Sequence, residues 1–315
     1  MLLVQCVKCQ GLGDRVPKNE IGNYRNNVFL EANMSNAGMP TGKIGNLTVS
    51  RLIIGGNQFS GWSHSRDLKY LRDLFKAYAT PERIMATLEM AEENGINTIL
   101  SGEADYLTRY NKERGGKMQW IAQIHPNTKD VTSNAKRAID LGAAAAYVQG
   151  GVGDSFTKGG RVDLLGEAVE FIRSNGIPAG IGGHSIQVPM AVEKAGIKPD
   201  FYMKTLHHGN YWSATPAEKR VEFNVDSNSG EDHDNIWEIA PEKTVEFMKG
   251  VATPWIAFKV LAAGAIHPSS GFQYAFENGA DFVCVGMFDF QIRENAIITR
   301  NAVAANQNRP RPWRA

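Results

Sequence analysis

The chain has 315 residues, of which 43% are hydrophobic and 21% charged, a balance typical of a globular protein large enough to bury a full core. A net charge of +1 argues against nucleic acid or an anionic membrane surface as a partner, and no run approaches the roughly 18 apolar residues of a membrane-spanning helix. The three cysteines give no disulfide framework, and the start MLLVQCV is too short for a signal peptide. We therefore expect a cytoplasmic protein that acts on a small molecule.

Residues 1–42 predict an irregular extension, because this segment is rich in Asn and Gly and shows no periodicity. From residue 43 to 305, short β-branched runs alternate with amphipathic segments that often end in Gly. The expected strands cover 49–56, 96–103, 118–126, 143–151, 177–185, 198–208, 253–264 and 280–288. The expected helices cover 80–95, 105–114, 131–142, 162–176, 188–196, 241–250, 271–279 and 290–305. Eight strand–helix units in about 260 residues predict one α/β domain, a (β/α)8 TIM barrel, in preference to an open doubly wound sheet.

Two later segments fall outside this alternation. Residues 209–240 form the long break, and roughly 30 residues without clear secondary structure predict a lid-like insertion or binding wall after the sixth strand. Residues 306–315, NQNRPRPWRA, predict a surface strap or a disordered tail.

The histidines gather at one end of the predicted strands. Each lies where a strand ends or in the loop that follows one: His64, His125, His184, His207, His208, His233 and His267. In a (β/α)8 barrel these positions share the rim that carries the active site. Alternation along the strands then places inward, or at the rim, the side chains of Asn97, Ile99, Ser101, Glu103, Gln123, His125, Tyr202, Lys204 and His208.

Two lysines interrupt predicted strands, Lys204 in the sixth and Lys259 in the seventh. A lysine pointing outward would be buried against helices without compensation, at a cost of several kcal/mol. We therefore expect both lysines to project into the barrel mouth. There they act either as ion-pair partners of Glu103 or in catalysis.

Two chemistries suit such a mouth. Imidazoles and a carboxylate from separate strands form a ligand set for a divalent ion such as Zn²⁺ or Mn²⁺, with Lys204 and Lys259 as acid/base groups. That predicted ligand set is Glu103, His125, His184 and His208, with His207 as the substitute for His208 or a further catalytic group. Alternatively, a lysine desolvated beside another lysine forms a Schiff base with a carbonyl compound. Lysines on strands six and seven are placed similarly to those of class I aldolases of this fold, which points to Lys204.

The same rim offers side chains for substrate. Aromatic residues of the insertion and of the loop after the first strand stack on sugar rings or anchor their loops, and amides bind hydroxyl groups. The expected substrate-binding residues are Asn57, Trp62, Gln123, Gln149, Tyr211 and Trp212. A hydroxy-carbonyl compound, derived from a sugar, fits this set.

The end of the sequence is similar to a known family. KVLAAGAI (259–266), GFQYAFENGADFVCVGMFDF (271–290) and QIREN (291–295) resemble the last part of the aldo/keto reductases, and KIGNLTVSRLIIGGNQFSG (43–61) and AEENGINTI (91–99) resemble their start. The resemblance covers nearly the whole barrel. It implies a (β/α)8 fold that binds NADP(H) through the loops after strands seven and eight. The residues it implies for the cofactor are Ala263, Gly264, Gly286 and Asn295.

The family's Asp–Tyr–Lys–His tetrad is not retained. Its Asp falls at Leu100 or Ser101, its Lys near Gln123 or Ile124, and its His at about Gln149, while Tyr106 matches the Tyr. Without the Lys and Asp, the hydroxyl of Tyr106 lacks the groups that would tune it as an acid.

Three functions follow. The first is a metal-dependent lyase, isomerase or hydrolase, and the second an NAD(P)H-dependent reductase with a rearranged site using Tyr106 and His125. The third is a Schiff-base aldolase, and a catalytically inactive sugar-binding barrel is the alternative to all of them. Substrate identity and the formation of a homo-oligomer stay open.

Overall fold

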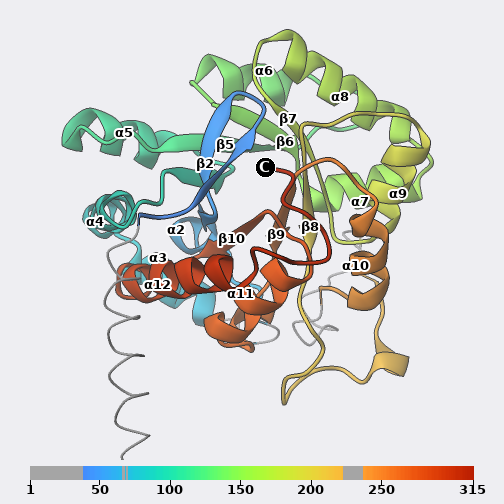
Figure 1. The fold of residues 1–315 in the computed structure, drawn as a ribbon. Helices are drawn as coiled ribbons and strands as arrows, with labels where there is room; N and C mark the ends of the chain where they lie inside the picture. Colours follow the sequence, from blue (N-terminus) through green and yellow to red (C-terminus); the bar gives the residue numbers. More distant parts are fainter. Residues whose placement is uncertain (1–37, 66–67, 69, 223–236) are drawn as a thin grey trace, which may run out of the picture. The chain divides into compact units, whose positions relative to one another are not determined.

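The computed structural model describes residues 38–315 except 66, 67, 69 and 223–236. Eight parallel strands close into a barrel in sequence order, with the last strand hydrogen-bonded to the first (Figure 1). They are β3 (Leu52–Gly55), β4 (Thr98–Ser101), β5 (Gln119–Ile124), β6 (Ala145–Val148), β7 (Ala179–Gly183), β8 (Phe201–Thr205), β9 (Trp255–Phe258) and β10 (Phe282–Gly286). The predicted (β/α)8 barrel is confirmed. Most of the predicted extension 1–42 lies outside the described residues, but its last two residues already belong to the first strand.

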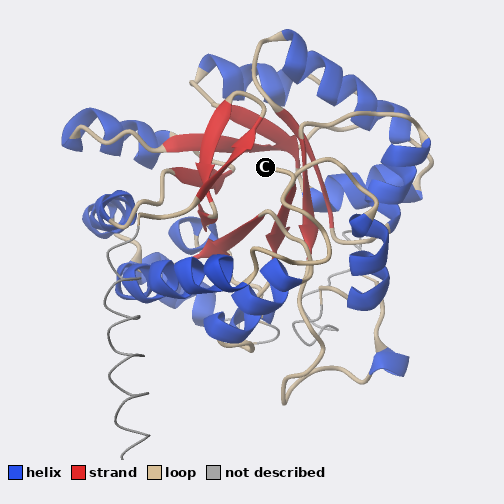
Figure 2. Cartoon of the chain, viewed as in Figure 1, coloured by secondary structure: helices blue, strands red, loops and turns tan. Residues whose placement is uncertain are grey.

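Helices surround the ring of strands (Figure 2). The α-helices are α2 (Asn57–Ser60), α3 (Tyr70–Tyr78), α4 (Pro81–Glu93), α5 (Asp105–Arg114), α6 (Ser133–Asp140), α7 (Gly150–Lys158), α8 (Val162–Ser174), α9 (Gln187–Lys194), α10 (Pro241–Lys249), α11 (Pro268–Glu277) and α12 (Asp289–Ala305). Two 3-10 turns, η1 (Ala217–Lys219) and η2 (Ala262–Gly264), lie in loops. None of the helices in the described part of the chain is both long and apolar enough to cross a bilayer.

The start of α4 shows how local sequence sets an element. Thr80 has extended backbone dihedrals, and its hydroxyl accepts a hydrogen bond from the Arg83 amide at 3.3 Å, while Pro81 occupies the first helical position. A side-chain acceptor and a proline suit the first turn, where backbone amides lack helical partners. The predicted helix over 80–95 is confirmed.

A hairpin that the sequence analysis did not predict closes the amino end of the barrel. Strands β1 (Thr41–Ile44) and β2 (Leu47–Ser50) pair antiparallel, and Gly45 in the turn has φ +55. Ile44 and Val49 are fully buried in the cluster that fills the barrel interior. The backbone amide of Ser50 donates to Asn97 Oδ1 at 2.9 Å, which joins the hairpin to the residue before β4.

The segment 306–315, predicted as a surface strap or a disordered tail, is attached to the fold through two buried arginines. Arg309 and Arg311 are buried, and both pair with Asp281, at 2.9 and 2.7 Å. Backbone carbonyl groups accept further guanidinium N–H groups of both arginines. A guanidinium can be buried when its donors are used in this way. A polar, proline-containing segment carries no sign of such a contact in its own sequence.

The inward faces of two strands, β4 and β8, differ from those predicted. Leu100 of β4, with Phe201 and Met203 of β8, belongs to the interior cluster. Ile99 and Tyr202 instead pack in the outer core, between strands and helices. Strands β4 and β8 therefore present inward the alternate residues to those predicted. Lys204 shares the outward face with Tyr202.

Candidate active site

Backbone strain is concentrated directly after β9. In the described part of the chain, the non-glycine residues with positive φ are Lys259 (60°), Ala262 (45°) and Ala263 (54°). This left-handed region disfavours side chains that carry a Cβ, and such strain is typical of functional sites. The turn at Lys259 breaks the strand's alternation and directs its amine to the ring of Trp237, 3.8 Å from the ring centroid.

Trp237 is the centre of a group of basic side chains. The rings of His64 and His184 contact its indole, with centroid separations of 5.0 and 5.4 Å. The His184 ring also contacts Phe258, an interior residue of β9, at 5.3 Å. His184 follows β7 and Lys259 follows β9, so these residues lie at the carboxyl end of the barrel. We call His64, His184, Trp237 and Lys259 the mouth cluster.

His184 is held by a carboxylate that the sequence analysis missed. Its Nδ1 lies 2.7 Å from Asp154 Oδ2, and Asp154 also accepts the backbone amides of His184 and Ser185. A carboxylate can only accept, so Nδ1 carries the proton and Nε2 is the basic nitrogen. Burial lowers the pKa of His184 although Asp154 raises it, so the imidazole is neutral at pH 7.

Glycines make this pairing possible. A Cβ on Gly153 would lie 2.0 Å from the carbonyl oxygen of Gly182, and one on Gly150 would lie 3.0 Å from the His184 ring. Because these positions have no side chain, α7 can lie directly on β7 and bring Asp154 beside His184. The available signal was the glycine density of VQGGVGDS and GIGGHS. The sequence analysis treated the first of these segments as a strand end and a loop.

The electrostatics of the cluster favour a neutral amine. Lys259 is partly exposed, but the side chains crowded around it remove water and lower its pKa well below 10.5. Among the described residues, neither a carboxylate nor a hydrogen-bond acceptor is paired with its amine. The pKa of His64 is lowered chiefly by the charge on Lys259, then by burial and by His184. A proton on Lys259 thus disfavours protonation of His64 and His184, while the pKa of Lys259 itself is lowered by desolvation.

The structure places Lys204 outside the mouth, so its predicted inward orientation was wrong. Its amine donates to Glu238 Oε2 at 2.5 Å and to Thr205 Oγ1 at 2.8 Å, and its side chain is 1% exposed. The prediction rejected an outward lysine because it would be uncompensated. The insertion supplies Glu238 as the compensating carboxylate, in place of the predicted Glu103.

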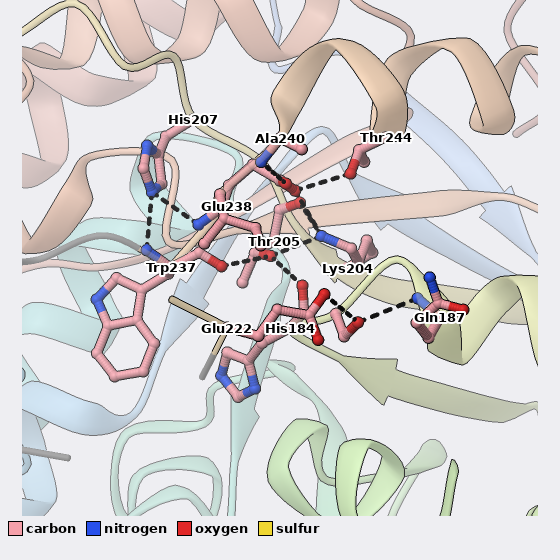
Figure 3. Close-up of polar contacts among 12 residues, drawn as sticks. His184, Gln187, Lys204, Thr205, His207, Glu222, Trp237, Glu238, Ala240 and Thr244 are labelled. Carbon is pink, nitrogen blue, oxygen red and sulfur yellow. Dashed lines mark hydrogen bonds and ion pairs between the residues drawn. The ribbon is translucent and has the colours of Figure 1, made fainter. Parts of the chain in front are cut away.

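Both ring nitrogens of His207 form hydrogen bonds within the protein, and Figure 3 shows those of Nε2. Its Nε2 accepts the backbone amides of Trp237 at 3.1 Å and Glu238 at 3.0 Å, while Nδ1 donates to the His208 carbonyl at 2.9 Å. This pattern requires the neutral ring, and burial lowers the pKa of His207 to about 4. The predicted catalytic residue His207 therefore contacts the chain that carries Trp237.

The predicted metal ligands are not brought together. Glu103 is exposed before α5, His184 contacts Asp154, and His208 Nε2 lies 2.9 Å from Ser270 Oγ. His125 lies beside Gln123, with 3.4 Å between Nε2 atoms. Across the part of the chain that the structure describes, no three His, Cys, Asp or Glu side chains are grouped so as to hold a metal ion. The donor set does not fit the metal site predicted from the sequence, and His233 lies outside the described residues.

The residues implied for NADP(H) are only partly available. Gln58 of α2 covers Gly286 so closely that a Cβ there would lie 1.6 Å from Gln58 Oε1. Asn295 is 2% exposed within α12. Ala263 and Gly264, in contrast, are exposed in η2.

The expected acid Tyr106 has a buried hydroxyl against Gly56 and Ser101. Burial raises the pKa of this hydroxyl. Ser101 lowers that pKa by a smaller amount, and the charge of Glu103 makes the smallest contribution, which is upward. The tyrosine is therefore not tuned toward proton transfer at neutral pH.

The predicted substrate residues separate into two groups. Gln123 faces the barrel interior, where the Tyr147 hydroxyl donates to it at 2.7 Å, and Gln149 Oε1 accepts the Val152 amide at the start of α7. The remaining side chains lie farther out on the rim: Trp212 is 92% exposed, Trp62 stacks with Arg72, Tyr211 contacts His207, and Asn57 is exposed at the start of α2.

A closed parallel barrel with titratable groups at the carboxyl ends of its strands has the architecture of the (β/α)8-barrel enzymes. More particularly, its fold is that of an aldo/keto reductase-like barrel. Two structures, each described as an aldo-keto reductase from Pseudomonas aeruginosa, give a TM-score of 0.57, at 14% and 15% identity. The matches cover 86% of this chain and 98% and 97% of those chains.

A further solved structure, the apo form of Gox0644, gives a TM-score of 0.53 at 9% identity, covering 87% of this chain and 96% of that one. No family model and no curated protein matches the sequence. At such identities the likeness shows the fold alone. It confirms the fold that the sequence resemblance implied.

Proposed function

We propose that this protein is an enzyme that forms a Schiff base between Lys259 and a small carbonyl compound. The observation that carries the proposal is the position of the Lys259 amine, 3.8 Å from the Trp237 ring centroid and without a carboxylate partner among the described residues. An amine must be neutral to attack a carbonyl carbon, and desolvation supplies that form. A structurally similar protein is described as an aldo-keto reductase, a name that also refers to carbonyl substrates.

Formation of the Schiff base releases one molecule of water. The Lys259 nitrogen bonds to the carbonyl carbon while the carbonyl π electrons move to oxygen, and that oxygen then leaves as water with both amine protons. The resulting imine, once protonated, withdraws electrons from a neighbouring C–H or C–C bond, as lyase and isomerase reactions require. Hydrolysis by water restores the amine.

His184 is suited to move the protons in these steps. Asp154 fixes Nδ1 as the protonated nitrogen and leaves Nε2 as the base, in a neutral ring that can take up and return a proton near pH 7. Both His184 and Lys259 contact Trp237, so the base and the nucleophile lie against the same indole. Gln123, on the inward face of β5, and His125, directly after this strand, add polar groups for substrate hydroxyls.

Two functions expected from the sequence have less support. The separated positions of Glu103, His125, His184 and His208 do not form a metal site, so we derive no metal-assisted step. A reductase has the support of the fold, but Gln58 covers Gly286 and the tetrad is incomplete.

Reductive trapping tests the proposal. The protein is incubated with pyruvate, dihydroxyacetone or glyceraldehyde, reduced with sodium borohydride and mapped by peptide mass spectrometry. We expect one adduct at Lys259, lost in Lys259→Met and kept in Lys198→Met, because Lys198 is exposed and outside the mouth. Labelling distributed over exposed lysines, with Lys259 unmodified, would refute the proposal.

A further inference from the structure

Residues 237–240, where the insertion returns to the barrel, are anchored to the end of β8 next to the mouth cluster (Figure 3). We propose that Lys204, Thr205 and His207 are positioning residues that hold Trp237 over Lys259. We call these three residues the β8 clamp. The inference rests on the proposed function only in treating Lys259 as the reacting amine.

His207 fixes the backbone of Trp237 directly. One nitrogen, Nε2, accepts both the Trp237 and Glu238 amides, at 3.1 and 3.0 Å, and His207 itself is buried. A single acceptor shared by two consecutive amides defines both the position and the direction of the chain there. The indole that extends from Trp237 is thereby directed to His64, His184 and Lys259.

Lys204 fixes Glu238, the residue that follows Trp237. Glu238 is 3% exposed, and its carboxylate accepts from the Lys204 amine at 2.5 Å, the Thr244 hydroxyl at 3.0 Å and the Ala240 amide at 3.1 Å. The carboxylate is thus compensated from the barrel, from α10 and from its own loop. Such a pair defines a unique position rather than supplying a large net stability.

Thr205 connects the backbones of His184 and Trp237. Its hydroxyl lies 3.0 Å from the His184 carbonyl and 3.2 Å from the Trp237 carbonyl. The backbones that carry the basic histidine and the indole are therefore bound to the same side chain. The rings of His184 and Trp237 have a centroid separation of 5.4 Å.

The clamp has a measurable consequence at Lys259. With Trp237 in place, the amine faces an indole and its pKa is lowered by loss of water. If the clamp is released, water returns to the amine and its pKa rises toward the ordinary value of about 10.4 for lysine. A residue that merely stabilises the fold would not move this titration.

Competitive labelling with acetic anhydride from pH 6 to 11 measures the titration of Lys259 without any substrate. The test compares wild type with His207→Leu, His207→Gln and Thr205→Val, with thermal unfolding recorded in parallel. We expect the Lys259 midpoint to rise by about one pH unit or more in His207→Leu and by less in Thr205→Val, since about one unit is a tenfold change in neutral amine. His207→Gln places an acceptor near the position of Nε2 and should retain the wild-type midpoint.

An unchanged Lys259 midpoint in His207→Leu, or in Thr205→Val if the leucine variant does not fold, would overturn the inference even if the melting temperature falls. The same labelling separates this inference from the proposed function. Absence of a borohydride adduct in wild type refutes Schiff-base chemistry. A midpoint that depends on His207 would still establish the clamp.

Discussion

At the scale of single residues, Lys204 in β8 and Lys259 directly after the adjacent strand β9 have opposite surroundings. Lys204 is paired with a buried carboxylate, whereas Lys259 has an indole beside it and two imidazoles nearby. Breaking a buried ion pair by removing one partner costs about 3–5 kcal/mol, so Lys204 is expected to matter for stability as well as for position. Lys259 instead has a strained backbone and a destabilised charge, which are features of a reactive residue.

The neutral state of His207 predicts acid-sensitive stability. Its pKa is about 4 in the folded protein, below the ordinary value of 6.5, so the unfolded chain binds the proton more readily between these values. Stability should therefore be complete above pH 6.5 and fall by about 3 kcal/mol as the pH is lowered to 4. Urea unfolding at pH 7 and pH 4.5 measures the loss.

The control for this prediction is His207→Gln, which has no proton to gain in that range. Its unfolding free energy should fall less than that of the wild type between the two pH values. Equal losses in both proteins would show that other groups account for the acid sensitivity.

At the scale of elements, the sequence predicted the eight strand–helix units but not the precise face of each strand. Alternation fixes which residues share a face, and the choice of inward face depends on the neighbouring helices and loops. In β5 the predicted inward residue Gln123 follows the alternation of Ile121 in the interior cluster. In β8, Lys204 lies outward because its ion-pair partner Glu238 is on that side. A partner 34 residues away in the chain cannot be recognised from the periodicity of a strand.

The short helix α7 carries Asp154 and depends on close backbone contact with β7. We predict that Gly153→Ala destabilises the protein by about 1–3 kcal/mol, the usual cost of overpacking, because the new Cβ would lie 2.0 Å from the Gly182 carbonyl oxygen. The displaced helix should also slow adduct formation at Lys259, since Asp154 orients His184. Chemical unfolding and the rate of borohydride trapping measure the two effects.

Gly166→Ala, in α8, is the matched control. A Cβ at that position meets only the end of the Ile197 side chain, at 3.3 Å, and alanine favours a helix over glycine. This variant should keep the wild-type trapping rate and be as stable as wild type or slightly more so. If Gly153→Ala behaves like Gly166→Ala, the close packing of α7 is not required.

At the scale of the whole molecule, both ends of the described chain complete the barrel. The β1–β2 hairpin fills the amino end with Ile44 and Val49, and the last residues pack around Asp281 through Arg309 and Arg311. The sequence predicted the barrel because its repeating pattern is local. It placed His64, His184 and Lys259 at one rim, but it did not predict these closures or the contacts of the mouth cluster with Trp237 and Asp154. Those contacts join residues far apart in the chain through dihedral angles and side-chain directions that no short motif encodes.

The central claim is that the amine of Lys259 bonds to a carbonyl carbon in the mouth of the barrel. A crystal structure of the protein reduced with borohydride in the presence of a trapped carbonyl compound tests it most directly. We predict continuous density from Lys259 Nζ into the compound, with Trp237 against it and His184 within reach of the bonded carbon's substituents. Density for the compound bound elsewhere, or in the mouth with an unmodified Lys259, would contradict the account.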